Sequence, residues 1–333
     1  MKILCISDGL IPEEYIAEGL SGTPELADAA VIRHWGHKSI DALQADNLKV
    51  EQGGPDAIKA PADIFADVDE FDAIITQFCP VPERIIERAS ALRVIGVLRG
   101  GTENVDIAAA EAHGIQVINT PGRNAEAVAE FTLGMILAQL RNISRSDANL
   151  RRGIWDRDFP DADAIPEVEG KTVGIVGLGQ IGRRVASFVQ VMGAKVAFFD
   201  PMVPAAEGFD RFNDITELAA ASDILCLHAR LTSETHHIVS RKVLEAMPEG
   251  SILVNTARSG LVDEAALIER LQSGRLSGAA IDTFEIEPLP ADSPFLTLRN
   301  VTITGHLAGS TIDAFKKTPR LLAPRVLRAL REK

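Results

Sequence analysis

Three ionisable side chains in the second half of the sequence have the types and positions that hydride chemistry on a 2-keto acid needs. Arg258 follows the apolar run SILVNTA, Glu287 lies in IDTFEIEP, and His306 follows VTITG. Such chemistry needs a cation for the carboxylate, an acid that protonates the carbonyl oxygen, and a group that keeps this acid charged. An arginine, a histidine and a glutamate are residue types that could meet these three needs.

A glycine turn earlier in the chain is typical of dinucleotide binding. Gly177, Gly179 and Gly182 form G-x-G-x-x-G after the apolar run TVGIV, and Asp200 ends the next apolar run. The glycines allow a tight turn, close approach of a pyrophosphate, and packing of the helix on its strand. A carboxylate at Asp200 suits ribose hydroxyls and repels a 2′-phosphate, which predicts NAD and not NADP. The alternative is a βαβ unit that uses these glycines for packing alone.

Short apolar runs and helical stretches alternate along most of the chain. Strands separated by helices predict parallel α/β sheets, and residues that follow strands then gather at the carboxyl edge of each sheet. Residues 33–65 are less regular. The predicted strands are residues 2–7, 71–76, 92–97 and 115–119 in the first part, and 172–176, 223–228, 251–256, 276–282 and 300–304 in the second.

Two longer helices are expected. Residues 124–143 contain no proline, begin at a plausible N-cap, Asn124, and are apolar nearly all round. Such a helix should be buried on most sides, at a domain junction or a dimer interface. Residues 310–331 should form a last helical stretch that is broken by Pro319 and Pro324.

Composition narrows the class of protein. The 333 residues allow two domains, and the net charge of −13 disfavours binding to nucleic acid or anionic membranes. The cysteines, at positions 5, 79 and 226, have no metal or disulfide spacing. The adjacent His236 and His237 are poorly spaced for one metal ion. The first residues resemble a strand and not a signal peptide, and no apolar run is long enough for a membrane span. We expect a cytoplasmic protein without a bound metal.

Four motifs in order resemble the D-isomer-specific 2-hydroxyacid dehydrogenase family: GLGQIG with Asp200, VNTARSGLVDEAAL, GAAIDTFEIEP and TGHLAGST. The stretch from RGGTENVD to GMILAQLR resembles its substrate loop and dimer helix. The resemblance covers most of residues 70–312. It implies an α/β fold of two doubly wound parallel-sheet domains. A flavodoxin-like substrate domain, residues 1–120 plus 308–333, would contain an inserted Rossmann NAD-binding domain, residues 121–307. The active site would lie in the cleft between them, and helix 124–143 would form the dimer.

The resemblance also assigns the catalytic residues. Arg258 would bind the carboxylate and carbonyl of the substrate, His306 would be the acid–base, and Glu287 would pair with His306. Glu285 is a rival for this last role, but Glu287 directly precedes a proline, as in the family pattern.

The cofactor contacts implied by the resemblance come from the glycine turn and from strand ends. Gln180 and Ile181 would meet the pyrophosphate, and Asp282 would hold the nicotinamide carboxamide. His228 ends a strand where contact with NAD is plausible, without acid–base function. The full set is Gly177, Gly179, Gln180, Ile181, Gly182, Asp200, His228, Thr256, Ala257, Arg258, Asp282, His306 and Gly309.

Substrate contacts are expected from Arg258 and from the loop after residues 92–97. Backbone N–H groups of Arg99, Gly100 and Gly101 would cradle the carboxylate. The Arg99 side chain either binds polar groups at the end of the substrate away from its carboxylate or pairs with Glu103. Phosphoglycerate-type members of the family have phosphate-binding arginines near the position of residues 76–82, but this segment contains no basic residue here. The substrate is therefore expected to be polar, with 3-phosphoglycerate in doubt.

The main interpretation is an NAD-dependent oxidoreductase that interconverts a 2-keto acid and a D-2-hydroxy acid, and the resemblance implies a homodimer. A phosphoglycerate dehydrogenase-type member and an NAD-sensing, corepressor-like binding protein remain alternatives. Formate dehydrogenase chemistry is disfavoured, because that branch has glutamine at the position of Glu287. The role of Arg230, where the family commonly has proline, stays open.

Overall fold

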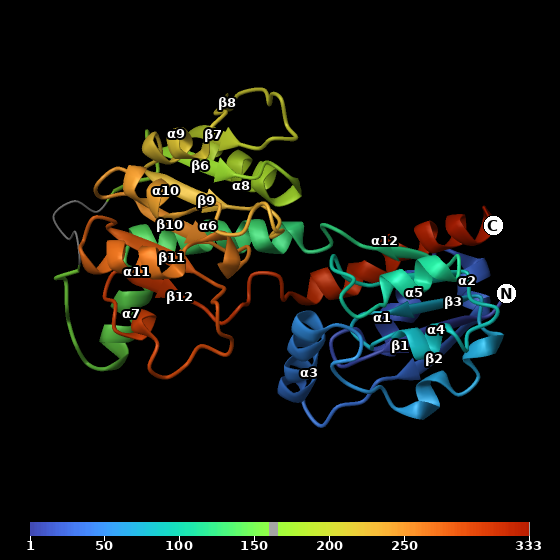
Figure 1. The fold of residues 1–333 in the computed structure, drawn as a ribbon. Coiled ribbons are helices and arrows are strands. Elements are labelled where there is room, and N and C mark those ends of the chain that lie inside the picture. Colours follow the sequence, from blue (N-terminus) through green and yellow to red (C-terminus); the bar gives the residue numbers. More distant parts are fainter. Residues whose placement is uncertain (160–165, 333) are drawn as a thin grey trace. The chain divides into compact units, whose positions relative to one another are not determined.

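The computed structural model describes residues 1–159 and 166–332 (Figure 1). The chain forms two compact units. The first unit consists of Met1–Asn124 and Ser310–Lys333, and the second unit is Ala125–Gly309. The chain therefore leaves the first unit after residue 124 and returns to it for the C-terminal helix.

The first unit is built on a five-stranded parallel sheet with the order β2-β1-β3-β4-β5. This is the flavodoxin-like form of the doubly wound sheet. Strands β1, β3 and β4 are buried along their whole length, which explains their continuous apolar sequences. The strands are β1 (Ile3–Ser7), β2 (Ala30–His34), β3 (Ala73–Thr76), β4 (Val94–Val97) and β5 (Gln116–Asn119).

The described part of the first unit contains six α-helices: α1 (Glu13–Leu20), α2 (Pro24–Ala29), α3 (Ile40–Gly53), α4 (Glu83–Ile86), α5 (Ile107–Ala112) and α12 (Ile312–Arg331). Helix α3 lies in the segment 33–65 that looked irregular in sequence. Ser39 caps its N-terminus, and Gly54 follows it with φ 76°. Because Leu43 and Val50 are its only buried apolar residues, the helical pattern of its sequence is weak.

The predicted break in the C-terminal helix is wrong, since α12 continues through Pro319 and Pro324. Tertiary packing explains why the lost backbone hydrogen bonds are tolerated. On α1, Gly19 lets Pro319 approach so closely that a Cβ at position 19 would lie 2.4 Å from the Cβ of Pro319. Val326 is likewise fully buried, and it packs where Gly96 of β4 leaves room.

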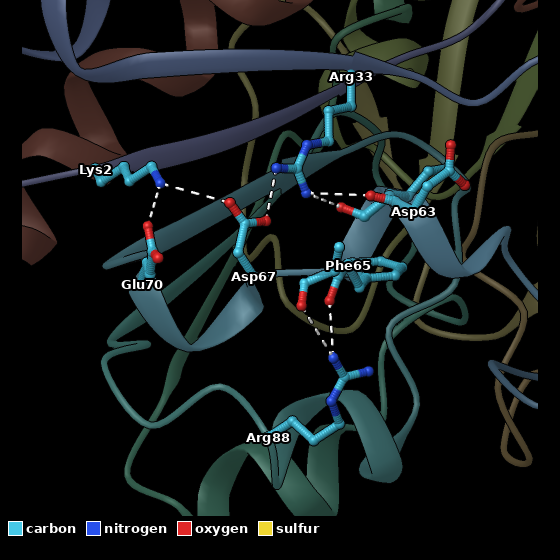
Figure 2. Close-up of polar contacts among 9 residues, drawn as sticks. Lys2, Arg33, Asp63, Phe65, Asp67, Glu70 and Arg88 are labelled. Atoms are coloured by element: carbon cyan, nitrogen blue, oxygen red, sulfur yellow. Dashed lines mark hydrogen bonds and ion pairs between the residues drawn. The ribbon is translucent and has the colours of Figure 1, made fainter.

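A polar network ties the short helices η1 (Ala62–Phe65) and η2 (Val68–Glu70) to the sheet (Figure 2). Arg33 on β2 contacts the Asp67 carboxylate at 2.6 Å and donates to the carbonyl of Ile64 at 2.7 Å. Lys2, next to β1, pairs with Glu70, and Arg88 donates to the carbonyl of Phe65 at 3.0 Å. These contacts are structural, because each cation holds a turn of the chain.

The second unit contains a seven-stranded parallel sheet with the order β12-β11-β10-β9-β6-β7-β8. The order reverses at β6, which makes this a doubly wound sheet with its ligand crevice expected beyond the carboxyl ends of β6 and β9. The strands are β6 (Thr172–Val176), β7 (Lys195–Phe199), β8 (Asp210–Arg211), β9 (Ile224–Leu227), β10 (Ile252–Asn255), β11 (Gly278–Ile281) and β12 (Val301–Ile303). The predicted class, two doubly wound parallel sheets, is confirmed.

The helices of the second unit are α6 (Ala125–Leu140), α7 (Ile143–Arg151), α8 (Gln180–Val191), α9 (Ile215–Ala220), α10 (Arg241–Ala246) and α11 (Glu264–Gln272). The apolar α6 packs against α8 and the sheet of its own unit. Its Gln139 accepts a hydrogen bond from Thr302 on β12 at 2.9 Å and donates to the carbonyl of Asn300 at 3.1 Å. Among the described helices, none is both long and apolar enough to cross a membrane.

Candidate active site

The centre of the candidate site is a contact between a histidine and a glutamate. The Nδ1 atom of His306 lies 2.8 Å from Oε2 of Glu287. The other oxygen of Glu287, Oε1, accepts the backbone N–H of Phe284 at 2.9 Å, so the carboxylate is held on both sides. The rival Glu285 lies instead 3.8 Å from Nε2 of His237. The geometry therefore places Glu287, and not Glu285, beside His306.

This contact changes the protonation of both partners. The hydrogen bond to Glu287 raises the pKa of His306 above its ordinary value, although burial and the charge of Arg258 oppose the rise. Burial alone would raise the pKa of Glu287, but the hydrogen bonds from His306 and Phe284 outweigh it and hold that pKa below its usual range. The pair thus favours an imidazolium next to a carboxylate.

A buried aspartate fixes the backbone that carries His306. This backbone has φ 56°, in the left-handed region, which a non-glycine residue seldom adopts without support. Asp282 is fully buried, and its carboxylate accepts the N–H groups of Leu307 and Ala308, both at 2.9 Å. It also accepts the hydroxyl of Thr304 at 2.6 Å. The family resemblance implied only a cofactor contact for Asp282, and the structure adds the role of positioning His306.

An asparagine positions Arg258 in a comparable way. Asn255 ends β10, its amide donates to the carbonyl of Arg258 at 2.9 Å, and its oxygen accepts the N–H of Ala257 at 3.0 Å. The hydroxyls of Thr256 and Thr132 lie 2.7 Å apart. Sequence reasoning missed Asn255, although an asparagine at the end of a strand is a known turn former.

The three candidate catalytic residues gather at one edge of one sheet. Arg258 follows β10, Glu287 lies beyond β11, and His306 lies beyond β12, and these three strands are neighbours. The Arg258 side chain is exposed, and its charge lowers the pKa of both Glu287 and His306. An exposed guanidinium beside a protonatable histidine can hold an anion while a proton is delivered to it.

The glycine turn has a geometry that fits a dinucleotide. Gly177 has φ 92°, and a Cβ there would lie 2.7 Å from the backbone nitrogen of Ala229. A Cβ at Gly182 would lie 2.2 Å from the carbonyl oxygen of Gly177, so the helix packs tightly on its strand. A Cβ at Gly179 would meet nothing within 4 Å, which leaves this face of the turn open to a ligand.

Two further features of this turn suit a dinucleotide. Helix α8 begins with Gln180 and Ile181, and its N-cap, Gly179, supplies no side-chain cap, so its first N–H groups are available to a phosphate. Asp200 follows β7, and its two carboxylate oxygens accept the N–H groups of Leu178 and Met202, both at 2.8 Å. These bonds hold the carboxylate at the end of the second strand, where ribose hydroxyls are expected.

His228 follows β9, next to the glycine turn. Within the described part of the chain, neither ring nitrogen of His228 has a hydrogen-bond partner, and both are buried. Burial lowers the pKa of His228 to about 3, so the ring is neutral at physiological pH. A neutral ring with unmet hydrogen-bonding capacity fits contact with a bound ligand and does not fit proton transfer.

The predicted substrate loop lies in the first unit. Arg99, Gly100 and Gly101 directly follow Leu98 at the end of β4. The Arg99 guanidinium stacks over the ring of Phe78 at 3.9 Å, and its Nη1 lies 2.9 Å from the carboxylate of Glu103. Of the two interpretations of the Arg99 side chain, pairing with Glu103 matches this geometry. Gly309, the last predicted cofactor contact, ends the second unit.

Comparison with known proteins agrees with this geometry. A family model described as "D-isomer specific 2-hydroxyacid dehydrogenase, NAD binding domain" matches residues 133–308. The D-3-phosphoglycerate dehydrogenase of Methanocaldococcus jannaschii is 41% identical over 75% of this chain and 48% of its own length. The hydroxypyruvate reductase of Thermotoga maritima is 36% identical over 79% of this chain and 86% of its own length. A solved D-2-hydroxyisocaproate dehydrogenase is 26% identical with a TM-score of 0.78, and the match covers 100% of this chain and 97% of that one.

The fold and the site define an NAD-binding protein with two doubly wound sheets. The chain belongs to the D-isomer-specific 2-hydroxyacid dehydrogenase family, because the family model covers more than half of it and relatives 41% and 36% identical match 75% and 79% of it. The matching region spans about half the length of the phosphoglycerate dehydrogenases that it resembles.

Proposed function

We propose that the protein is an NAD-dependent oxidoreductase that interconverts a polar 2-keto acid and the corresponding D-2-hydroxy acid. The observation that carries this proposal is the 2.8 Å contact between His306 and Glu287. It lies beside Arg258, on a sheet that also bears a dinucleotide-type glycine turn. The similarity to the hydroxypyruvate reductase supports a small, polar substrate.

Bound NADH would supply the hydride, and this chain's residues would bind the substrate and handle the proton. The guanidinium of Arg258 would hold the substrate carboxylate and carbonyl. His306 would donate a proton from Nε2 to the carbonyl oxygen, because its Nδ1 is taken by Glu287. Fixed groups of the protein, and not mobile water, thereby stabilise the negative charge that develops on the carbonyl oxygen.

The NAD contacts proposed for the second unit follow from the glycine turn and the strand ends. N–H groups at Gly179, Gln180 and Ile181 would receive the pyrophosphate, and Asp200 would receive the adenosine ribose. Asp282 would hold the nicotinamide carboxamide, and the ring nitrogens of His228, which have no hydrogen-bond partner in the described part of the chain, would contact the cofactor nearby. Thr256, Ala257 and Gly309 would contribute through their backbone.

Replacing His306 tests this proposal. In His306→Gln, we expect the rate of 2-keto acid reduction to fall by roughly a hundredfold or more, which is the scale of general acid catalysis. NADH affinity, measured by fluorescence titration, should fall far less than the rate, because the glycine turn is intact and His306 is one of many proposed cofactor contacts. The matched control is His113→Gln, a histidine on the first unit outside every proposed site. Full activity of His306→Gln would reject the assignment.

We also propose a homodimer in the cytoplasm. Apolar side chains are exposed on and just after α7, namely Ile143, Leu150, Ile154 and Trp155, the last with 82% of its surface accessible. Such a patch suits contact with a second copy. The three cysteines are buried thiols without disulfides, as in a reducing compartment. Sedimentation equilibrium tests the dimer, and a monomer at micromolar concentration would contradict it.

A further inference from the structure

A glutamate of the second unit, outside the residues assigned so far, contacts the turn that carries Glu287. Glu264 is the first residue of α11, and its Oε2 accepts the backbone N–H of Glu285 at 3.2 Å. The preceding N–H, that of Phe284, donates to Oε1 of Glu287 at 2.9 Å, while Oε2 of Glu287 contacts His306. Two successive N–H groups of one turn therefore bind two carboxylates, one within the turn and one from a helix.

Two other contacts reach this turn. The ring of Phe284 is buried and packs edge-on against the ring of Phe295, with 5.5 Å between the ring centres. Oε1 of Glu285 lies 3.8 Å from Nε2 of His237, but 49% and 39% of these two side chains are exposed. An ion pair so exposed adds little stability, because water screens it. Apart from His306, the half-buried Glu264 is therefore the main polar contact that the described side chains make to this turn.

The helix end that carries Glu264 is itself fixed by backbone hydrogen bonds. Asp263 caps α11 through its side chain, and its N–H donates to the carbonyl of Val239 at 3.0 Å. The N–H of Val239 donates in turn to the carbonyl of Leu261 at 2.9 Å. None of these bonds uses the side chain of Glu264. The segment between Arg258 and α11 should therefore stay in place when this side chain is replaced.

The charge of Glu264 can be separated from its role as a hydrogen-bond acceptor. Burial and the like charge of Glu285 raise the pKa of Glu264, and the N–H of Glu285 opposes the rise. A carboxylate in such surroundings is typical of functional positions. The N–H needs only an oxygen that accepts it, and the amide oxygen of a glutamine can do so without charge.

We propose that Glu264 is a positioning residue of the reduction, whose acceptor oxygen holds the turn so that Glu287 stays in contact with Nδ1 of His306. This inference rests on the proposed function, in which His306 delivers the proton. Without an acceptor at position 264, the N–H of Glu285 loses its partner and the turn moves to let it reach water. Glu287 then supports the imidazolium of His306 less well.

The charges that act on His306 allow this effect to be isolated. They belong to Glu287, Arg258 and Asp282, and a substitution at position 264 removes none of them. Two variants that both lack the charge of Glu264 differ only in whether an acceptor is present. A difference between them in the pKa of His306 therefore reports the geometry of Glu287.

Glu264→Gln and Glu264→Met are these two variants. Their side chains are similar in length and in helix propensity, but only glutamine keeps an oxygen for the N–H. The pKa of His306 is measured by NMR titration of ¹³C-labelled histidine, and its signal is identified by its absence in His306→Gln. We expect this pKa to be lower in Glu264→Met than in Glu264→Gln by about half a pH unit or more. Glu264→Ala, which also lacks an acceptor, should resemble Glu264→Met.

Reduction of hydroxypyruvate with NADH gives a second measurement. In Glu264→Met, kcat should fall roughly fivefold or more below that of Glu264→Gln, and activity should be lost at a lower pH as pH rises. KM should stay within about twofold, because the segment of Arg258 is unchanged. Glu269→Met is the matched control, since Glu269 is an exposed glutamate on α11 that pairs with Arg241. It should leave kcat and the pH profile as in wild type.

The outcomes separate this inference from the proposed reaction. The same pKa of His306 in Glu264→Met and Glu264→Gln would overturn the inference, whatever the kinetics. Equal losses of kcat in the two variants would also overturn it, because they would assign the effect to the charge of Glu264. A difference in pKa in a protein that reduces no 2-keto acid would support the positioning contact and reject the proposed function instead.

Discussion

At the scale of single residues, the candidate chemistry depends on a histidine held in an uncommon conformation. His306 has a left-handed backbone, and Asp282 supports it through the N–H groups of Leu307 and Ala308. Glu287 then fixes the ring from its Nδ1 side. The residue types of the catalytic set could be read from the sequence. The supporting bonds of Asp282 and Asn255 could not, because they depend on how turns at the ends of neighbouring strands fold.

The pH dependence of reduction should report on Glu287. Reduction needs protonated His306, whose pKa is raised by Glu287, so activity should be present at low pH and be lost as pH rises through that raised pKa. In Glu287→Gln the support for the imidazolium is removed, and the loss should begin at a lower pH. Steady-state kinetics over a pH series measures both profiles. Superimposable profiles from a folded Glu287→Gln protein would remove Glu287 from this role.

The choice of cofactor should depend on Asp200. A 2′-phosphate would approach its carboxylate, and repulsion between partly desolvated charges is worth a few kcal/mol, so we expect kcat/KM with NADH to exceed that with NADPH by roughly tenfold or more. Asp200→Asn removes the charge and keeps an acceptor oxygen for the turn, so the ratio of the two efficiencies should fall. Equal efficiency with both cofactors in the wild type would contradict the assignment.

Among the helices and strands, the sequence patterns predicted the buried strands. They failed where the structure depends on packing against a distant part of the chain. Buried strands such as β3 and β10 appear as continuous apolar runs, and both were predicted. Helix α3 was missed, because it buries few apolar residues. The predicted break in α12 was wrong, because α12 packs against α1, where Gly19 leaves space for Pro319. Neither result follows from local sequence, since each depends on a partner element distant in the chain.

The glycine turn allows a matched comparison of two similar substitutions. In Gly182→Ala the new Cβ would lie 2.2 Å from the carbonyl oxygen of Gly177, so we expect a loss of stability of about 1–3 kcal/mol, as for overpacking. In Gly179→Ala the Cβ enters open space, so stability should change by no more than about 0.5 kcal/mol. NADH affinity of Gly179→Ala should nevertheless fall, because the methyl group occupies the path of the pyrophosphate.

Chemical denaturation and NADH titration of both variants measure these two effects separately. Wild-type NADH affinity in a stable Gly179→Ala protein would show that the pyrophosphate does not pass over this face of the turn. A stable Gly182→Ala protein would show that α8 can shift on its strand at little cost.

In the molecule as a whole, the glycine turn comes late in the sequence because most of the first unit precedes the dinucleotide-binding unit in the chain. The first unit is left after residue 124 and completed by α12, so the dinucleotide-binding unit is an insertion. Alternating strands and helices predicted two parallel sheets, and the family resemblance predicted the insertion. The strand orders, which place Arg258, Glu287 and His306 beyond the ends of neighbouring strands, became visible only in the structure.

The most direct test of the central claim is NADH oxidation by the purified wild-type protein with a panel of 2-keto acids, followed by chiral analysis of the product. We expect oxidation of NADH that depends on the keto acid and is fastest with a polar member of the panel, with a product of D configuration. A flat response across the panel, in a protein that still binds NADH, would reject the dehydrogenase activity and favour an NAD-sensing binding protein.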